Sequence, residues 1–185
     1  GGMHKIVEGM TALAKEKGVE FVLDCEVKKL EVKDGKVSKA ITTKGDFEGT
    51  HFISGADYHH TDKHLLDAQY HNYTKKYWDT RKMAPSSLLF YLGVDKKLTG
   101  LRHHNLFFDE SFDQHAIEIY DDPQWPSNPL FYVCVPSITD DSVAPEGKES
   151  VFLLVPVAPD LKDDEETREK YYHMVMERLE SLTKQ

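Results

Sequence analysis

The chain has 185 residues, of which 39% are hydrophobic and 30% charged, and its formal net charge is −9. This balance is typical of a folded globular protein and excludes a disordered tail. The negative charge argues against nucleic-acid binding, because a phosphate backbone needs a basic surface. The length allows one domain or parts of two, with enough residues to bury a core.

The two cysteines indicate the compartment. Cys25 and Cys134 lie far apart in different predicted strands, and the sequence has no CxxC pair or disulfide framework. We interpret both as buried small hydrophobic side chains, typical of a protein from the reducing cytoplasm. No apolar run approaches the roughly 20 residues that span a bilayer, and we expect no signal peptide. The chain enters a helix almost at its first residue, so we expect an excised piece of a longer protein.

In the first half of the chain, apolar residues at helical spacing from Met3 onward predict a helix that stops at Gly18. Four short strands follow, at about 20–24, 26–33, 36–43 and 47–54. The Asp34-Gly35 pair predicts a type I′ hairpin turn, because both residues tolerate positive φ angles. Two short helices are expected at about 61–67 and 73–80, the first capped by Thr61 or Asp62.

The second half is richer in aromatic residues. We predict four apolar strands and then a helix with an acidic start, at 86–94, 105–110, 129–137, 149–157 and 163–182. The whole chain therefore reads as an α/β (mixed α+β) protein with a boundary around Met83-Ala84-Pro85. One face of the second sheet must meet a core, and the other must meet a helix or an apolar ligand.

The stretch "ISGADYHHTDKHLL" (53–66) could hold a metal, since His60 and His64 are four apart and Asp57 might add a ligand. However, the HExxH pattern is absent, and a helix that starts at Thr61 or Asp62 leaves His60 outside it. We therefore predict no metal site. His103 and His104 precede an aromatic strand; they either meet a substrate or are partly exposed loop residues. The sequence contains no GxSxG, GxGxxG or P-loop motif.

Several segments resemble, in order, the bacterial-type phytoene desaturases, a family of FAD-dependent carotenoid desaturases and isomerases. They are "GGMHKIVEGMTALAKEKGVEF", "CEVKKLEVKDGKVSKAITTKG", "FISGADYHHTDKHLL", "PSSLLFYLGVDKKLTGLRHHNLFF" and "LFYVCVPSITDDSVAPEGKESVFLLVPV". The resemblance covers nearly the whole chain. The family's N-terminal GxGxxG segment and C-terminal glycine-rich segment are not in this sequence. The resemblance thus implies an internal fragment of an FAD/NAD(P)-binding-type flavoprotein fold, with the C-terminal part of the FAD-binding domain at 1–83 and the substrate-binding domain at 84–185.

The resemblance also implies a reaction, in which hydrogen leaves a long isoprenoid or carotenoid and a hydride passes to FAD. Val27 would present backbone groups to the adenine edge, Gly55 and Ala56 would be small where the chain passes the cofactor, and Asp57 would bond backbone or ribose. At this loop the chain has Gly55 where the family usually has asparagine, and Tyr58 where proline is common. These differences weaken any transfer of a specific side-chain contact.

His103 and His104 are the candidate bases, and no residue is a secure one. The fragment alone is expected to retain no FAD and to be inactive. A hydrophobic isoprenoid substrate dissolved in a bilayer also implies that this protein, predicted above to be cytoplasmic, makes peripheral contact with the membrane. The alternatives are a non-catalytic isoprenoid- or lipid-binding module and, with the weakest support, a metal-dependent hydrolase built on Asp57, His60 and His64.

Overall fold

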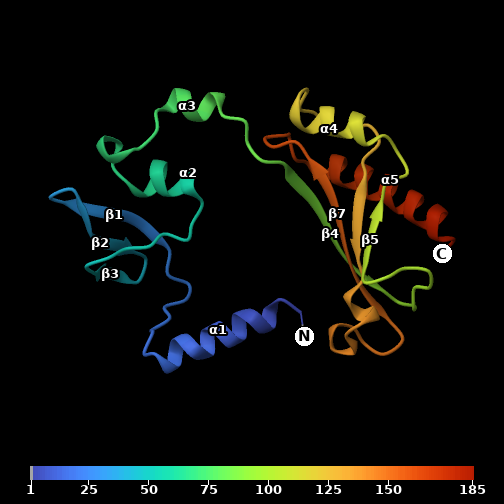
Figure 1. The fold of residues 1–185 in the computed structure, drawn as a ribbon, viewed down its shortest axis with the longest axis horizontal. Helices are drawn as coiled ribbons and strands as arrows, with labels where there is room; N and C mark the ends of the chain where they lie inside the picture. The colour runs from blue at the N-terminus through green and yellow to red at the C-terminus, as the bar shows by residue number, and fades with distance from the viewer. Residues whose placement is uncertain (1) are drawn as a thin grey trace. The chain divides into compact units, whose positions relative to one another are not determined.

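The computed structural model describes residues 2–185 and divides the chain into two units, Gly1–Arg81 and Lys82–Gln185 (Figure 1). We call them unit 1 and unit 2. Each unit contains one antiparallel sheet with helices, which confirms the predicted mixed α+β class. The assignment of 1–83 and 84–185 to an FAD-binding and a substrate-binding domain stays a prediction.

Unit 1 begins with the predicted helix, α1 (His4–Glu16), and contains a three-stranded meander of β1 (Val27–Lys33), β2 (Lys36–Thr42) and β3 (Gly45–Glu48). Asp34 and Gly35 have φ angles of 50° and 74°, which confirms the predicted turn between β1 and β2. The strand predicted at 20–24 is wrong, and the last strand ends at Glu48 rather than near 54. Both errors have the same cause, because an apolar run becomes a strand only when a neighbouring strand pairs with it.

The second part of unit 1 is a series of short helical turns: α2 (Tyr58–His60), the π-helix η1 (Thr61–Leu65), the 3-10 turn η2 (Ala68–Tyr70) and α3 (Lys75–Thr80). The predicted cap at Thr61 or Asp62 is wrong. Asp57 is the cap instead, since its Oδ1 accepts a hydrogen bond from the His60 N–H at 3.0 Å. The helical segment therefore begins at Tyr58, three residues earlier than expected, and it includes His60.

A buried carboxylate holds this helical series together. Asp62 is 2% exposed, and its Oδ1 accepts a 2.8 Å hydrogen bond from the Asn72 N–H. Lys63 Nζ lies 3.3 Å from its other oxygen. Burial raises the pKa of Asp62, but the Asn72 hydrogen bond and the Lys63 ammonium outweigh burial and leave the pKa below its ordinary value of 3.8. Asp62 thus joins η1 to the segment before α3.

Unit 2 is built on a four-stranded antiparallel sheet in the order β4-β7-β6-β5. Its strands are β4 (Ser86–Val94), β5 (His104–Phe107), β6 (Phe131–Cys134) and β7 (Glu149–Val157). β4 and β7 match their predicted ranges, whereas β5 and β6 are shorter than predicted. Two 3-10 turns, η3 (Pro136–Ile138) and η4 (Asp141–Val143), lie in the connection from β6 to β7.

One face of this sheet is covered by the closing helix α5 (Glu165–Thr183) (Figure 1). Asp164 caps the helix by accepting a 2.9 Å hydrogen bond from the Thr167 N–H. Alternate residues of β7 are buried, as expected for a strand with one face against a core. The core formed there consists of Phe131, Val133, Val135, Val151, Leu153, Val155, Val157, Val175 and Leu179.

A helix that was not predicted, α4 (Phe112–Tyr120), lies between β5 and β6. Its Glu118 is 3% exposed and accepts hydrogen bonds from the Ser127 N–H at 2.9 Å, the Ser127 hydroxyl at 2.7 Å and Gln114 Nε2 at 2.9 Å. Burial raises the pKa of Glu118, yet these hydrogen bonds outweigh burial and leave the pKa below its ordinary value. The carboxylate fixes α4 to the loop that leads into β6.

Among residues 2–185, the structure contains no helix with the length and apolarity to cross a membrane.

Candidate functional site

The sheet of unit 2 has a second face, opposite α5, that we call the open face. Strand register places its residues in two rows, because residues paired across an antiparallel sheet share a face. The first row runs through all four strands, from Leu89 to Leu154, Tyr132 and Leu106. The second row is Tyr91, Phe152, Cys134 and His104.

The open face is apolar and accessible. Tyr91 is 77% exposed, Leu106 67% and Leu89 39%. The ring centroid of Phe152 lies 5.2 Å from that of Tyr91 and 6.3 Å from that of Tyr132, so aromatic rings form a continuous patch. The sequence predicted a core on one face and a helix or an apolar ligand on the other, and in unit 2 the face opposite α5 carries exposed apolar side chains.

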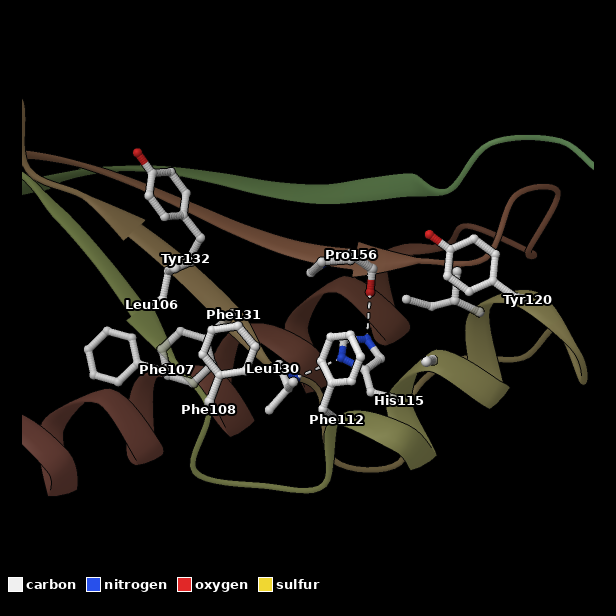
Figure 2. A pocket seen from close by; sticks show the side chains of 12 residues that line it. Leu106, Phe107, Phe108, Phe112, His115, Tyr120, Leu130, Phe131, Tyr132 and Pro156 are labelled. Atoms are coloured by element: carbon white, nitrogen blue, oxygen red, sulfur yellow. Dashed lines mark hydrogen bonds between the residues drawn. The ribbon is translucent and has the colours of Figure 1, made fainter.

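The first row leads to a cavity of about 220 Å³ between the edge strand β5, the start of β6 and α4 (Figure 2). Leu106 and Tyr132 belong both to the open face and to the cavity lining. The remaining wall is mostly aromatic or aliphatic and includes Phe107, Phe108, Phe112, Ile119, Tyr120 and Leu130. Apolar surface therefore continues from the sheet into the cavity.

The one imidazole in the cavity wall is committed to structure. His115 is 4% exposed; its Nε2 lies 2.9 Å from the carbonyl oxygen of Pro156, and its Nδ1 accepts from the Leu130 N–H at 3.1 Å. These two bonds, visible in Figure 2, require the neutral tautomer with the proton on Nε2. His115 has no free lone pair with which to accept a proton from a ligand.

His103 and His104, the predicted candidates for a base, lie at the other end of the open face. Their ring centroids are 4.3 Å apart, and His104 is exposed while His103 is half-buried. His103 Nδ1 lies 2.5 Å from Thr139 Oγ1, and His104 Nδ1 lies 2.6 Å from the Tyr132 hydroxyl. The structure thus places both residues beside the exposed apolar surface of the sheet, and their catalytic role stays a prediction.

Tyr132 keeps its proton in this cluster. Burial, followed by the hydrogen bond and charge of Cys134, raises the pKa of Tyr132 to about 12. The phenol is therefore neutral at neutral pH, and its hydroxyl can donate to His104 Nδ1 or accept from it, according to the tautomer of His104.

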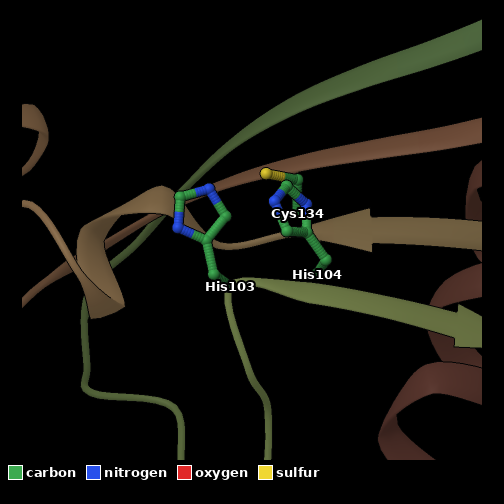
Figure 3. A group of neighbouring side chains, drawn as sticks. All are labelled: His103, His104 and Cys134. Atoms are coloured by element: carbon green, nitrogen blue, oxygen red, sulfur yellow. The ribbon is translucent and has the colours of Figure 1, made fainter. Parts of the chain in front are cut away.

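The sequence alone did not predict that Cys134 lies next to His103 and His104. Its thiol and one nitrogen each from His103 and His104 all lie within 4.8 Å of one another, a set of donors that could hold a metal ion (Figure 3). The signal that would have found it is the pairing of β5 with β6, which makes Cys134 the direct partner of His104.

Asp57, His60 and His64 do not form a metal site. Among the described residues, the group of three possible metal ligands is His103, His104 and Cys134. His60 and His64 have ring centroids 5.3 Å apart, but the Asp57 carboxylate caps the helix. His59 packs at 4.8 Å against the ring of Trp78. Of these histidines, His59 packs inside unit 1, whereas His60 and His64 are exposed.

The predicted cofactor residues Val27, Gly55, Ala56 and Asp57 all lie in unit 1. Val27 is the first residue of β1, an edge strand, so part of that strand's backbone has no neighbouring strand. A Cβ built on Gly55 would have no described atom within 4 Å, and Gly55 does not have a positive φ. No described neighbour crowds Gly55, so the predicted need for a small residue would have to come from a bound molecule.

Curated proteins that resemble this chain include carotenoid and phytoene desaturases. The chain is 40% identical to a carotenoid 3,4-desaturase of Haloarcula japonica over 95% of its length and 36% of the relative's. It is 35% identical to a phytoene desaturase of Fusarium fujikuroi, over 90% of the chain and 29% of the relative. It is 31% identical to a zeta-carotene-forming phytoene desaturase of Myxococcus xanthus, over 87% and 31%. The chain thus spans about a third of the length of these relatives, and no protein-family model matches it.

Proposed function

Because this chain belongs to the phytoene desaturase family, we propose that it supplies the polyene-contacting surface, and part of the FAD contact, of an FAD-dependent carotenoid-type desaturase. The observation that carries this proposal is the open face of unit 2. Its row of Leu89, Leu154, Tyr132 and Leu106 crosses the whole sheet and continues into the cavity beside α4.

A surface of this kind suits a long isoprenoid. Such a molecule has almost no polar group by which it can be recognised, so its binding free energy comes from buried apolar area at about 25 cal/mol per Å². Aromatic side chains add contact at little cost in side-chain entropy, and rings from β4, β6 and β7 lie along the open face. The imidazoles of His103 and His104 supply polar groups at one end of this surface.

Unit 1 fits an FAD contact in two respects. The edge strand β1 begins at Val27 with backbone groups that could bond an adenine edge, and Gly55-Ala56 offers an uncrowded backbone to a cofactor. FAD, when bound, would supply the acceptor for the hydride. Asp57 already bonds the His60 N–H through Oδ1, so contact with the ribose would fall to its second oxygen.

On the open face, this chain's own residues would hold and orient the polyene and exclude water from it. Proton removal, if it occurs here, falls to His103 or His104. Tyr132 cannot serve as the base at neutral pH, because its pKa is raised to about 12.

The test places residues 1–185 in the matching segment of the Haloarcula japonica carotenoid 3,4-desaturase. We expect the chimera to retain FAD, measured by flavin absorbance, and to lengthen a carotenoid polyene, measured by the red shift of its spectrum. A folded chimera that binds FAD but neither binds nor desaturates a polyene would contradict the assignment of the open face.

Two matched leucines sharpen the test. Leu106 is 67% exposed on the open face, and Leu182 is 47% exposed on α5. Leu106→Gln should raise KM for the polyene several-fold, whereas Leu182→Gln should leave it unchanged. Equal effects would mean that the open face has no special part in substrate binding.

A second pair tests unit 1. Gly55→Val should reduce FAD retention without loss of fold, since its Cβ meets no described atom within 4 Å. Gly9→Val, on α1 with similar free space, is the control and should retain FAD fully. The 185-residue chain alone should bind FAD weakly, and tight binding in a titration would contradict that expectation.

A further inference from the structure

Three side chains of types that commonly ligate metals, His103, His104 and Cys134, lie together at one end of the open face, where β5 begins and β6 ends (Figure 3). His104 and Cys134 are direct register partners across these strands. The pairing extends one step further, because the Val135 N–H donates to the carbonyl oxygen of His103 at 2.8 Å. The backbone ladder therefore holds all three residues next to one another without any bound ion.

Hydrogen bonds orient both imidazoles. His103 uses Nδ1 toward Thr139 Oγ1, at 2.5 Å, and His104 uses Nδ1 toward the Tyr132 hydroxyl, at 2.6 Å. The nitrogen left for another partner is Nε2 in each ring. Metal-binding histidines are commonly held in this way, with one ring nitrogen on the metal and the other on a polar group of the protein.

We propose that His103, His104 and Cys134 form a binding site for a thiophilic transition-metal cation of the Zn²⁺ class. Two imidazoles and one thiolate suit Zn²⁺, whereas Mg²⁺ and Ca²⁺ select oxygen ligands. A tetrahedral zinc ion sets its ligand atoms roughly 3.4 Å apart. Since the donor atoms already lie within 4.8 Å of one another, small side-chain rotations close the site.

The donor count also describes what kind of metal site this is. Three protein ligands leave a fourth position open for water or a small ligand, unlike the closed four-ligand sites that serve only structure. The site borders the apolar surface of Phe152 and Tyr132, which are neighbours of Cys134 and His104 in the register. Binding of the cation would release the thiol proton and use the imidazole nitrogens, so a metal-loaded chain would lose both histidines as proton acceptors.

The experiment uses the 185-residue chain after removal of metals with a chelator. Co²⁺ is titrated as the probe, because a thiolate ligand gives it a charge-transfer band in the near ultraviolet, and Zn²⁺ is then added as the competitor. We expect one Co²⁺ per chain, with a thiolate band that Zn²⁺ abolishes. No band at one equivalent, or binding without saturation, would overturn the proposal.

Matched variants locate the site. Cys134→Ser should remove the band and weaken Zn²⁺ binding at least tenfold, while Cys25→Ser, at the other half-buried cysteine, should change neither. His103→Ala and His104→Ala should each weaken Zn²⁺ binding at least tenfold, and His173→Ala, at an exposed histidine of α5, should not. A band that survives Cys134→Ser or disappears with Cys25→Ser would place the metal elsewhere.

Two further variants separate ligation from folding. Cys134→His creates a three-histidine site and should keep Zn²⁺ binding while losing the thiolate band, even if Cys134→Ser folds poorly. Thr139→Val removes the partner of His103 Nδ1 and should weaken Zn²⁺ about tenfold with the band intact. A Cys134→His chain that folds, by circular dichroism, but fails to bind Zn²⁺ would contradict the proposal. These metal titrations contain neither flavin nor polyene, so a failure to bind metal would leave the desaturase proposal unaffected. Failure of the chimera to desaturate a polyene would likewise leave the metal-site proposal unaffected.

Discussion

The two units of the chain differ in where their apolar side chains lie. Unit 2 encloses a core in which Val133, Val155 and Val175 are completely buried. Among the described residues of unit 1, Leu65 and the charged Asp62 are the two buried side chains. Apolar residues of α1 are exposed instead, from 55% at Leu13 to 68% at Met10.

This difference teaches that the units rely on different interactions. Unit 2 is stabilised by hydrophobic burial between its sheet and α5, which is cooperative over the whole unit. Unit 1 depends on local features, namely the Asp34-Gly35 turn, the Asp57 cap and the buried Asp62. We therefore expect unit 1 to open locally at a lower free energy than unit 2.

The largest effect should come from the core of unit 2. Leu153 is 1% exposed, so Leu153→Ala should lower the free energy of unfolding of unit 2 by roughly 2–5 kcal/mol. Leu13→Ala on α1 is the matched control and should change stability by less than about 0.5 kcal/mol. Urea unfolding followed by the fluorescence of Trp125 and Trp78 measures both, and similar values for the two variants would remove the contrast between the units.

The next effect concerns the buried carboxylate of unit 1. Asp62→Ala leaves the Asn72 N–H without its acceptor and should cost roughly 1–3 kcal/mol in local stability. Hydrogen exchange of the Asn72 amide in unit 1 measures this change, with the amides of β7 in unit 2 as the internal reference. A loss of protection that spreads equally to β7 would mean that the units do not open separately.

The same carboxylate predicts a pH dependence. The folded-state pKa of Asp62 lies below 3.8, so its stabilising effect is complete above that pH and is lost as the pH falls through the lower folded value. Asp62→Asn should flatten the acid dependence of Asn72 protection and leave the acid dependence of unit 2 unchanged, because that depends on Glu118. Unchanged acid sensitivity of Asn72 in the variant would contradict the assignment.

Two Arg–Asp pairs within unit 2 should contribute differently to its stability, and loss of the shielded pair should have an effect of intermediate size. Arg178 binds Asp109 through two nitrogens, donates to the Pro129 carbonyl oxygen at 2.6 Å and lies over the Phe131 ring. Arg178→Ala should cost about 1–2 kcal/mol, because this pair is largely shielded from solvent. Arg168→Ala, whose pair with Asp163 is exposed, should have little effect on thermal unfolding, and the reverse order would be contrary to the structure.

The smallest effect lies in the hairpin of unit 1. Gly35 has a φ of 74°, so Gly35→Ala should cost about 1 kcal/mol through backbone strain and should show in hydrogen exchange of β1 and β2. Gly147, with a φ of 78° in a loop of unit 2, is the control. Gly147→Ala should strain its loop without reducing the protection of β1 and β2.

The sequence alone was sufficient for elements whose signal is local. The apolar runs of β4 and β7 gave both strands to the residue, and Asp34-Gly35 gave the hairpin turn. The helix α4 also has a local signal, since Ser111 accepts from the Gln114 N–H as a cap, but it lies in a segment read as a long loop. The strand expected at 20–24 did not form because none of the strands in residues 2–185 pairs with this segment, and a pairing partner is not a local property of the sequence.

The candidate site was harder to predict for the same reason. His103 and His104 were recognised as chemical residues, but their neighbours come from sequence positions about 30 residues away, through the register of β5 and β6. The predicted strand began at residue 105, one residue too late, which left His104 outside the sheet and hid its pairing with Cys134. The Asp57 cap moved His60 into the helix through a similar shift of a few residues.

Buried residues and open-face residues alternate strictly along β7, and this alternation limits how the open face can change over evolution. Val151, Leu153, Val155 and Val157 are buried in the core beside α5, and the residues between them lie on the open face. Substitutions at Phe152 and Leu154 can therefore alter the shape of the open face, which we propose contacts the polyene, while the core keeps its composition. A deletion or insertion of a single residue would exchange the two sets, and Val155 would move to the open face. We expect natural variation in β7 to consist of replacements at alternate positions, with changes in length confined to the loops that flank it.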